Sequence, residues 1–268
     1  MAENSAISWT RHTWNPWMGC TKISPACDGC YAEFLMDKRY RKVQWGNHPR
    51  VRTSAHTWND PFRWQRQAER DGDRPFVFCA SLADIFDNQV DPQWRADAFE
   101  VMRKTPRLIY QLLTKRPQNI VKMVAAVGYL PLNAAIGTTI EDQPRADVNL
   151  PELDRARRCL PALFSFVSYE PAVGPLVIPP ELMPDWVIAG GETDQGDHKA
   201  RKPDPDWFRS LRDQCAAAGV PFHFKQWGNW GVLDRARDPD TMFRGTKHIT
   251  GRLLDGREHN EFPAVPAI

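Results

Sequence analysis

The sequence contains no run of eighteen apolar residues, and its N-terminus lacks a basic region followed by an apolar stretch. A membrane-spanning helix needs about 20 consecutive apolar residues, and a secretory signal needs a basic start before its apolar segment. No repeat, low-complexity tract or obvious linker interrupts the 268 residues. We therefore expect a soluble, cytoplasmic protein with a single domain over residues 1–268, of which residues 231–268 form a C-terminal extension.

The sequence also has little net charge, with 35 basic and 33 acidic residues and a formal value of +2. Such a balance gives no overall field that by itself favours nucleic acid. A local basic groove stays open as an interpretation, because charged runs are either solvated faces or phosphate contacts. Its candidate members are Lys199, Arg201 and Lys202 together with Arg39, Arg41, Lys42, Arg50 and Arg52, with Trp45 and Trp58 placed to stack on bases.

Six cysteines are present, although a chain of this length buries enough apolar surface to fold without disulfides. In a reducing compartment, clustered cysteines indicate a metal site or a catalytic group. Cys20, Cys27 and Cys30 fall within eleven residues, where Pro25 and Gly29 permit turns. Cys79, Cys159 and Cys215 lie in apolar or helix-like stretches, so we predict that they are core residues.

Two kinds of metal site remain open for the three clustered thiols. A structural zinc site normally has four protein ligands in two pairs, and here the single C-x-x-C would need His12, His48 or His56 to complete it. An iron–sulfur cluster held by three cysteines instead leaves one iron open to another ligand.

Short apolar runs alternate with helix-like stretches such as 92–103 and 206–218, a pattern typical of parallel strands with helical crossovers. Length and composition favour strands for these runs. They are residues 6–9, 76–80, 108–113, 134–137, 163–167, 186–189 and 221–224. A helix is also expected to begin near Tyr31, directly after the cysteines.

Polar residues follow nearly every predicted strand, which favours a partial or full (β/α) barrel of the TIM-barrel type over an open α/β sheet. Barrel chemistry gathers at the carboxyl ends of the strands. The residues in question are Ser81 and Asp84, then Lys115 and Arg116, Glu141, Glu170, the set Gly190, Gly191 and Glu192, and finally Lys225.

The chain from about residue 7 to 230 resembles a largely uncharacterised family of phage and bacterial three-cysteine proteins, itself similar to the radical S-adenosylmethionine superfamily. The motifs that carry the resemblance are Trp14-Asn15-Pro16, the three cysteines with Tyr31, Leu113 to Pro117, Ser168 to Pro171, Gly190 to Glu192 and Lys225 to Gly228. Six residues separate Cys20 from Cys27, whereas the superfamily usually has three at that point.

The resemblance implies a [4Fe-4S] cluster on Cys20, Cys27 and Cys30, within a loop over residues 14–31, and a bound S-adenosylmethionine that is cleaved reductively for radical chemistry. It implies catalytic roles for Lys115, Glu170 and Lys225. It assigns cofactor binding to Tyr31, Arg116, Glu141, Gly190, Gly191 and Glu192. A DNA or nucleotide substrate and an electron donor such as flavodoxin or ferredoxin follow as expected partners, in the host cytoplasm if a phage encodes the chain. The alternative is a non-catalytic, zinc-stabilised module that binds nucleic acid or protein.

Overall fold

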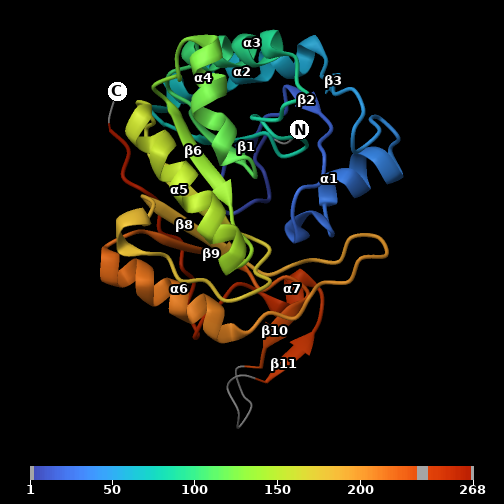
Figure 1. Ribbon diagram of the computed structural model, residues 1–268, viewed down its shortest axis with the longest axis vertical. Helices are drawn as coiled ribbons and strands as arrows, with labels where there is room; N and C mark the ends of the chain where they lie inside the picture. The colour runs from blue at the N-terminus through green and yellow to red at the C-terminus, as the bar shows by residue number, and fades with distance from the viewer. Residues whose placement is uncertain (1–2, 234–240, 267–268) are drawn as a thin grey trace.

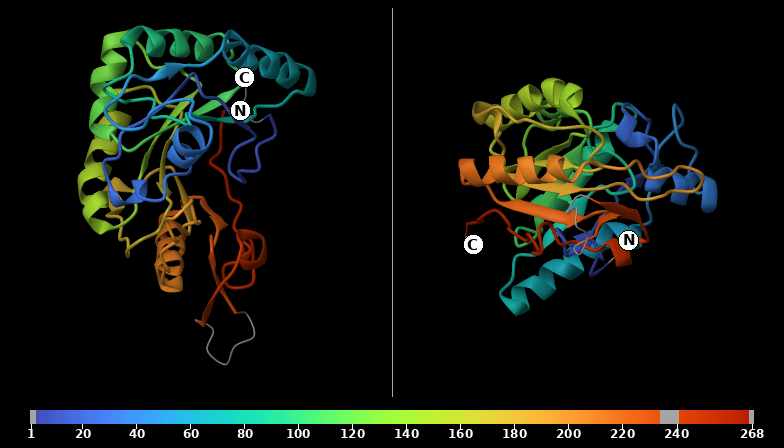
Figure 2. Two further views of the ribbon diagram at one scale, coloured as in Figure 1. Left: turned by 90° about the vertical axis from the view of Figure 1, so that its right-hand side faces the viewer. Right: turned by 90° about the horizontal axis from the view of Figure 1, so that it is seen from below.

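A computed structural model describes residues 3–233 and 241–266. Its main sheet has seven strands, all parallel, in the order β1-β4-β5-β6-β7-β8-β9 (Figure 1). The strands are β1 His12–Thr13, β4 Phe76–Cys79, β5 Ile109–Thr114, β6 Ala134–Thr139, β7 Ser165–Tyr169, β8 Trp186–Gly190 and β9 Phe222–Gln226. The sheet curls into a half-barrel with helices on its outer face (Figure 2), so the expected α/β partial barrel is confirmed.

The longer helices are α2 Ala55–Asp71, α3 Pro92–Arg103, α4 Ile120–Val127, α5 Gln143–Cys159 and α6 Pro205–Ala218. Three of them begin in the same way, because Asp91, Asp142 and Asp204 each accept a backbone N–H of the first turn, with a proline at the first or second helical position. An aspartate cap satisfies an otherwise unpaired donor, and proline has no N–H to lose there. The helices expected over 92–103 and 206–218 are confirmed.

Alternate residues of strands β4 to β8 enter two different apolar layers. In β7, Phe166 faces an inner cluster with Trp186 and Ile109, whereas Val167 and Tyr169 face an outer cluster shared with the helices. Burial on both faces is the usual condition of a parallel sheet, and it explains why the sequence shows continuous apolar runs.

Smaller elements surround the sheet. Two-stranded pairs are formed by β2 Trp17–Met18 with β3 Val51–Arg52 and by β10 Trp230–Val232 with β11 Met242–Arg244. The short helices are η1 Pro25–Cys27, α1 Tyr31–Glu33, η2 Phe34–Arg39, η3 Pro117–Asn119, η4 Pro180–Leu182 and α7 Lys247–Thr250. The part of the chain that the structure describes has no helix long and apolar enough to span a bilayer.

The C-terminal segment returns along the amino ends of the strands. Trp186 Nε1 donates to the Glu261 carbonyl at 3.0 Å, and the Phe262 ring packs against Trp186 and His223. This segment therefore covers the bottom of the half-barrel, opposite the end where the polar residues gather.

Two sequence predictions are wrong. Residues 6–9 form a turn, with Thr10 N donating to the Ile7 carbonyl, and the first strand begins only at His12. This stretch is apolar because Ile7 and Trp9 fill the inner cluster from below. Cys159 is exposed rather than in the core, because it is the last residue of α5, whereas Cys79 and Cys215 are buried as expected.

Candidate functional site

The three clustered thiols lie on the cysteine segment, residues 19–30, which leaves β2 and leads into α1. Gly19, at φ +103°, starts the segment, Cys27 ends the 3-10 turn η1, and Cys30 directly precedes the helix at Tyr31. Cys27 is buried, and Cys20 and Cys30 pack beside the small apolar cluster of Met36, Val43 and Trp45. The helix expected near Tyr31 is confirmed, although it is only three residues long before η2 continues it.

The electrostatic surroundings of the thiols are mixed. Burial raises the pKa of Cys20 to about 11, with Asp84 acting in the same direction and Arg116 opposing it. Burial also raises the pKa of Cys30, against which the charge of Lys115 acts. Metal ions bind thiolates, so loading this segment would release protons, and the two nearby cations favour the deprotonated form.

Arg116 is the first of three side chains that fasten the cysteine segment to the barrel. Its Nη1 donates to Cys20 Sγ at 3.5 Å and to Asp84 Oδ2 at 3.0 Å, and its Nη2 donates to the Thr21 carbonyl at 2.8 Å. Asp84 also accepts from the Thr114 hydroxyl and from the Lys115 backbone N–H. The turn after β5 is therefore organised by one buried aspartate from the turn after β4.

Glu141, after β6, is the second side chain that fastens the cysteine segment to the barrel. It is fully buried, and its Oε1 accepts from Ala26 N at 3.4 Å and lies 3.8 Å from Arg145 Nε. Among the residues the structure describes, Glu141 Oε2 has no hydrogen-bond partner. Arg145 Nη2 also reaches the Ile23 carbonyl, at 3.3 Å. Arg145 was missed by sequence reasoning, although its position four residues after Glu141 at a helix start is a signal for such a pair.

Glu192, after β8, is the third side chain that fastens the cysteine segment, and it acts through Arg201. Its carboxylate accepts from Arg201 Nη2 at 2.6 Å and from His198 Nε2 at 3.0 Å, while Arg201 Nη2 also donates to the Pro25 carbonyl at 3.1 Å. Burial acts to raise the pKa of Glu192, but the hydrogen bonds from Arg201 hold it below its usual value. His198 and Arg201 thus connect the loop after β8 to the cysteine segment.

Three glycines allow close packing around this connection. A Cβ on Gly29 would lie 2.5 Å from His198 Cδ2, and a Cβ on Gly191 would lie 2.0 Å from the Trp227 carbonyl oxygen. Gly190 is less crowded, since a Cβ there would lie 3.3 Å from Glu170 Cδ. Close packing against the Trp227 carbonyl explains why residue 191 is a glycine. Gly190 instead borders the Glu170 side chain on the inner face.

The remaining candidates lie on the inner side of the strand ends. Lys225 Nζ and Glu170 Oε1 form an ion pair at 2.5 Å, and Lys115 Nζ donates to Thr139 Oγ1 at 3.5 Å. The Tyr31 hydroxyl donates to the Ser81 carbonyl at 2.6 Å. Tyr31 is 41% exposed as a residue, and the pKa of its hydroxyl is raised by local burial and by the charges of Cys30 and Glu170.

The predicted basic groove is not formed as expected. Arg50 is buried in an ion pair with Asp87 at 2.6 Å, and Trp45 is buried in the apolar cluster. Arg201 is engaged by Glu192, and Lys199 Nζ lies 3.9 Å from Asp194. Folding therefore pairs Arg50, Arg201 and Lys199 with carboxylates and removes these three from the predicted groove.

Three thiols on one short segment, with cations beside two of them, are a donor set that fits an iron–sulfur cluster. Gly29, between Cys27 and Cys30, lets the His198 ring approach the backbone of the segment closely. Within the described residues, no three His, Cys, Asp or Glu side chains are arranged to hold a single metal ion. Cluster thiolates bind different irons, so they need not converge on one point as zinc ligands do.

A family model described as "Protein of unknown function (DUF5131)" matches residues 4–263, so the chain belongs to that family. The comparison with curated proteins gives no match.

Among solved structures, the chain is similar to spore photoproduct lyase. A tyrosine-to-phenylalanine variant of that enzyme and a cysteine-to-alanine variant with a dinucleoside spore photoproduct each show 10% identity and a TM-score of 0.50. Each match covers 92% of this chain and 72% of the other. A double variant with bound AdoMet shows 12% identity and a TM-score of 0.45 over 60% of this chain, which spans about half (46%) of that structure. At such identities the likeness shows a shared fold.

Proposed function

We propose that this member of the DUF5131 family is an iron–sulfur enzyme that cleaves S-adenosylmethionine reductively and directs the resulting radical at a nucleobase. The observation that carries the proposal is the cysteine segment itself. The segment that carries its three thiols is fastened to the barrel by Arg116, by Glu141 and, through Arg201, by Glu192. Arg116, Glu141 and Glu192 come from the ends of three different strands. Structural support of this density at the carboxyl ends of barrel strands is typical of an active site.

Cys20, Cys27 and Cys30 would hold the cluster. When bound, a four-iron cluster with three thiolate ligands supplies an open iron for the amino and carboxylate groups of S-adenosylmethionine and the electron that breaks its sulfonium bond to give a 5′-deoxyadenosyl radical. Arg116, held in place by Asp84, donates to Cys20 Sγ and so disperses negative charge from that sulfur.

Glu141 and the inner ion pair would orient the reactants. Glu141 Oε2, which has no hydrogen-bond partner among the described residues, is a buried acceptor suited to an amino group or a ribose hydroxyl. Glu170 and Lys225, with Lys115 and Thr139 on other strand ends, present charged and polar groups on the inner face, where a bound substrate would be sheltered from water.

The substrate class rests on chemistry and on likeness. Donors and acceptors on Lys115, Thr139, Glu170 and Lys225 match the hydrogen-bonding edge of a base. The similar lyase structure binds a dinucleoside spore photoproduct, which supports a nucleobase in DNA or a nucleotide. An external donor such as flavodoxin or ferredoxin would supply the electron.

Anaerobic reconstitution with iron and sulfide tests the cluster. We expect Cys20→Ala, Cys27→Ala and Cys30→Ala to lose most bound iron, and Cys159→Ala, on the exposed end of α5, to retain it. A zinc-stabilised module would instead be colourless and would carry zinc. Full iron content in all three clustered variants would contradict the proposal.

Product analysis tests the chemistry. Chromatography of the dithionite-reduced protein with S-adenosylmethionine should show 5′-deoxyadenosine and methionine. The Glu170→Gln variant should keep its iron and turn over substrate more slowly. An intact cluster with bound S-adenosylmethionine and no cleavage would exclude the radical reaction.

A further inference from the structure

The loop that follows β8 crosses the cysteine segment, and we call its residues 193–201 the clamp loop (Figure 1). At its end, Arg201 Nη2 donates to the Pro25 carbonyl at 3.1 Å. Nearer its middle, the His198 ring lies against the backbone of Gly29, where a Cβ would come within 2.5 Å of His198 Cδ2. The clamp loop thus contacts the stretch that carries the second and third thiols.

The tip of the clamp loop reaches η2, which follows the thiols. A Cβ on Gly196 would lie 2.9 Å from Phe34 Cδ2, so the loop backbone packs directly on that ring. Arg116 contacts the other end of the cysteine segment, at Cys20 and Thr21. Arg116 therefore holds the first thiol directly, and the clamp loop holds the stretch around the other two.

Asp194 bonds the clamp loop to the β10–β11 hairpin. Its backbone N–H donates to Asn229 Oδ1 at 2.8 Å. Its carboxylate accepts from Arg244 Nη2, at 2.6 and 2.8 Å to its two oxygens, and from Ala200 N at 2.8 Å. Trp230 Nε1 in turn donates to the Ala200 carbonyl at 2.9 Å. Both ends of the clamp loop are therefore bonded to the hairpin.

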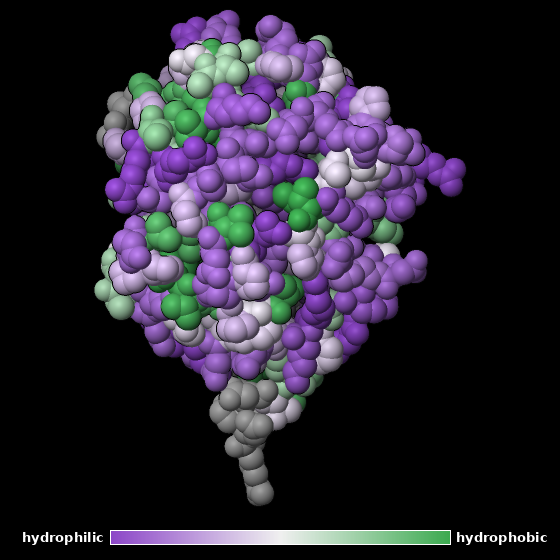
Figure 3. Space-filling model, in the orientation of Figure 1, coloured by the Kyte–Doolittle hydropathy of each residue, from purple (hydrophilic) through white to green (hydrophobic). Residues whose placement is uncertain are grey.

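The clamp loop is held mainly by polar contacts. Residues 193–199 are half-buried or exposed, and the right-hand margin of the molecule, where this loop lies, is mostly hydrophilic (Figure 3). The ion pair of Asp194 and Arg244 has side-chain exposures of 31% and 41%, so it is a small part of the stability of the whole fold. A loop with few buried apolar contacts opens locally, and each polar contact is then a large part of what keeps it closed.

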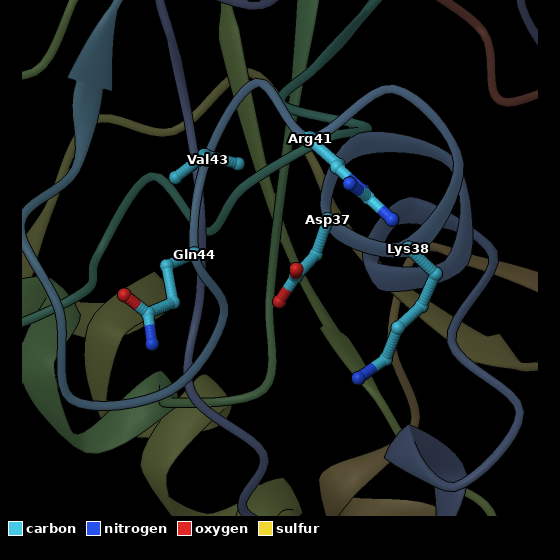
Figure 4. Close-up of a pocket in the computed structure, with 5 residues that line it drawn as sticks. All are labelled: Asp37, Lys38, Arg41, Val43 and Gln44. Carbon is cyan, nitrogen blue, oxygen red and sulfur yellow. The ribbon is translucent and has the colours of Figure 1, made fainter.

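Another side of the thiols borders solvent. Cys20 and Cys30 pack on the small apolar cluster that includes Val43. An open hollow of about 420 Å³ meets this apolar cluster and is lined by Asp37, Lys38, Arg41, Val43 and Gln44 (Figure 4). How well a metal centre is retained should then depend on how firmly the cysteine segment itself is held.

We propose that Asp194 and Arg244 are positioning residues for the metal centre, because they keep the clamp loop closed over the stretch that carries Cys27 and Cys30. The inference rests on the proposed function, since it requires an iron–sulfur cluster on the three thiols. It assigns a role to the β10–β11 hairpin, which lies far along the chain from the cysteines. When the clamp loop opens, Arg201 and His198 leave the cysteine segment, and the iron becomes accessible to a chelator. Residues that orient metal ligands without touching the metal commonly affect metal affinity in this way.

The first measurement needs no iron. Limited digestion of the iron-free protein with trypsin, followed by mass spectrometry, reports cleavage after Lys199 and Arg201 within the clamp loop. We expect Arg244→Gln to be cut there about fivefold faster than the wild-type protein, with a nearly unchanged midpoint of urea unfolding. Arg244→Lys keeps the positive charge and should restore most of the protection. The matched control is Arg103→Gln, which removes the exposed ion pair of Arg103 with Glu100 on α3 and should leave the cleavage rate unchanged.

The second measurement uses the cluster-loaded protein under anaerobic conditions. The ferrous chelator bathophenanthroline disulfonate is added to the dithionite-reduced protein, and iron release is followed by the colour of the chelate. Asp194→Asn and Arg244→Gln both remove the ion pair and should release iron about fivefold faster than the wild-type protein. Arg244→Lys and Arg103→Gln should release it at about the wild-type rate.

Three results would overturn the inference while the wild-type protein still binds iron, which leaves the proposed function intact. The first is an equal rate of trypsin cleavage in Arg244→Gln and the wild-type protein. The second is faster cleavage with an unchanged rate of iron release. The third is a loss of urea stability in Arg244→Gln as large as that in Trp186→Ala, since the ion pair would then support the whole fold. A wild-type protein that holds no iron after reconstitution would overturn both the inference and the proposed function.

Discussion

The two ends of the half-barrel are built from different chemistry. At the bottom, Trp186, Phe166 and Ile109 form an apolar cluster that the C-terminal segment covers, and its few polar groups include His223 and Gln111. At the top, charged side chains contact the cysteine segment through hydrogen bonds of defined direction. The difference indicates that the bottom supplies stability, whereas the top positions groups.

The comparison extends to the cysteines. Cys79 and Cys215 are buried, and among the described residues no cation acts to lower the pKa of either. Burial is the main cause that raises both pKa values. Cys20 is partly buried, and burial raises its pKa as well, but here Arg116 donates a hydrogen bond to the sulfur. The neighbours of a cysteine, and not its burial, therefore distinguish the two ends of the half-barrel. Substitutions can test the two ends separately.

The largest expected effect is at the bottom. Trp186→Ala should lower the free energy of unfolding by about 4 kcal/mol, because it leaves a cavity in the inner cluster and removes the hydrogen bond to the Glu261 carbonyl. Urea titration measures the change, with Leu132→Ala, at a side chain that is 74% exposed, as the control. A loss below about 1 kcal/mol would mean that the bottom is not the stabilising end.

Arg116 tests whether the top is purely functional. Its ion pair with Asp84 is buried, with side-chain exposures of 7% and 6%, so Arg116→Met should cost about 3 kcal/mol by leaving Asp84 without its partner. The double variant D84N/R116M should recover part of that loss, because neither charge is then buried alone. Unfolding of the iron-free protein separates this cost from any effect on the cluster. Equal stability of the single and double variants would contradict a buried, interacting pair.

The fold was predictable because its physical signals are local. Runs such as 134–137 and 186–189 are too short for buried helices, and the aspartate–proline starts at residues 91 and 204 are set by neighbouring residues. The turn at 6–9 was not predictable in the same way. Ile7 and Trp9 belong to the inner cluster although they lie in a turn, so the apolar character of residues 6–9 reflects tertiary contacts and not an extended backbone.

The sequence was enough to predict which residues form the candidate site, but not which residues they contact. The polar residues after each strand identify Arg116, Glu141 and Glu192, yet the sequence does not show that Arg201 and His198 bind Glu192. That contact depends on the path of the loop 193–200, which brings His198 against Gly29. Likewise, Arg50 appears as a surface cation in the sequence because its partner Asp87 is 37 residues away.

A smaller effect concerns how stability depends on pH, and it arises from His223 at the bottom of the half-barrel. Burial, reinforced by Arg252, lowers the pKa of His223 to about 3 from an ordinary value of 6.5. Below pH 6.5 the unfolded chain takes up a proton that the folded chain refuses, so stability falls as the pH falls towards 3. Between pH 6.5 and 5 this group should cost about 2 kcal/mol.

The measurement is urea unfolding of the wild-type protein and His223→Gln across that pH range. The variant starts from a lower stability, since the Ser8 hydroxyl loses its contact with His223 Nε2 at 2.9 Å, but its stability should change less with pH. His12, whose pKa burial lowers to about 4, contributes in the same direction in both proteins. Parallel pH profiles of the two proteins would exclude His223 as a source.

Glu141 should show the smallest effect on folding and the clearest separation of structure from function. Its Oε1 makes only long contacts, at 3.4 Å to Ala26 N and 3.8 Å to Arg145 Nε, and its Oε2 has no partner among the described residues. Glu141→Gln keeps an oxygen for Ala26 and removes a buried charge that is poorly compensated. We expect the free energy of unfolding to change by less than about 1 kcal/mol.

If Oε2 accepts a hydrogen bond from S-adenosylmethionine, binding of that ligand to Glu141→Gln should weaken about tenfold, because a charge-assisted hydrogen bond contributes about 1.5 kcal/mol or more. Calorimetric titration of the cluster-loaded protein measures this, with Glu152→Gln on the outer face of α5 as the matched control. Unchanged binding with an unchanged unfolding curve would show that Glu141 has no role in holding the ligand. A large loss of stability would show that its contact with the cysteine segment is its main role.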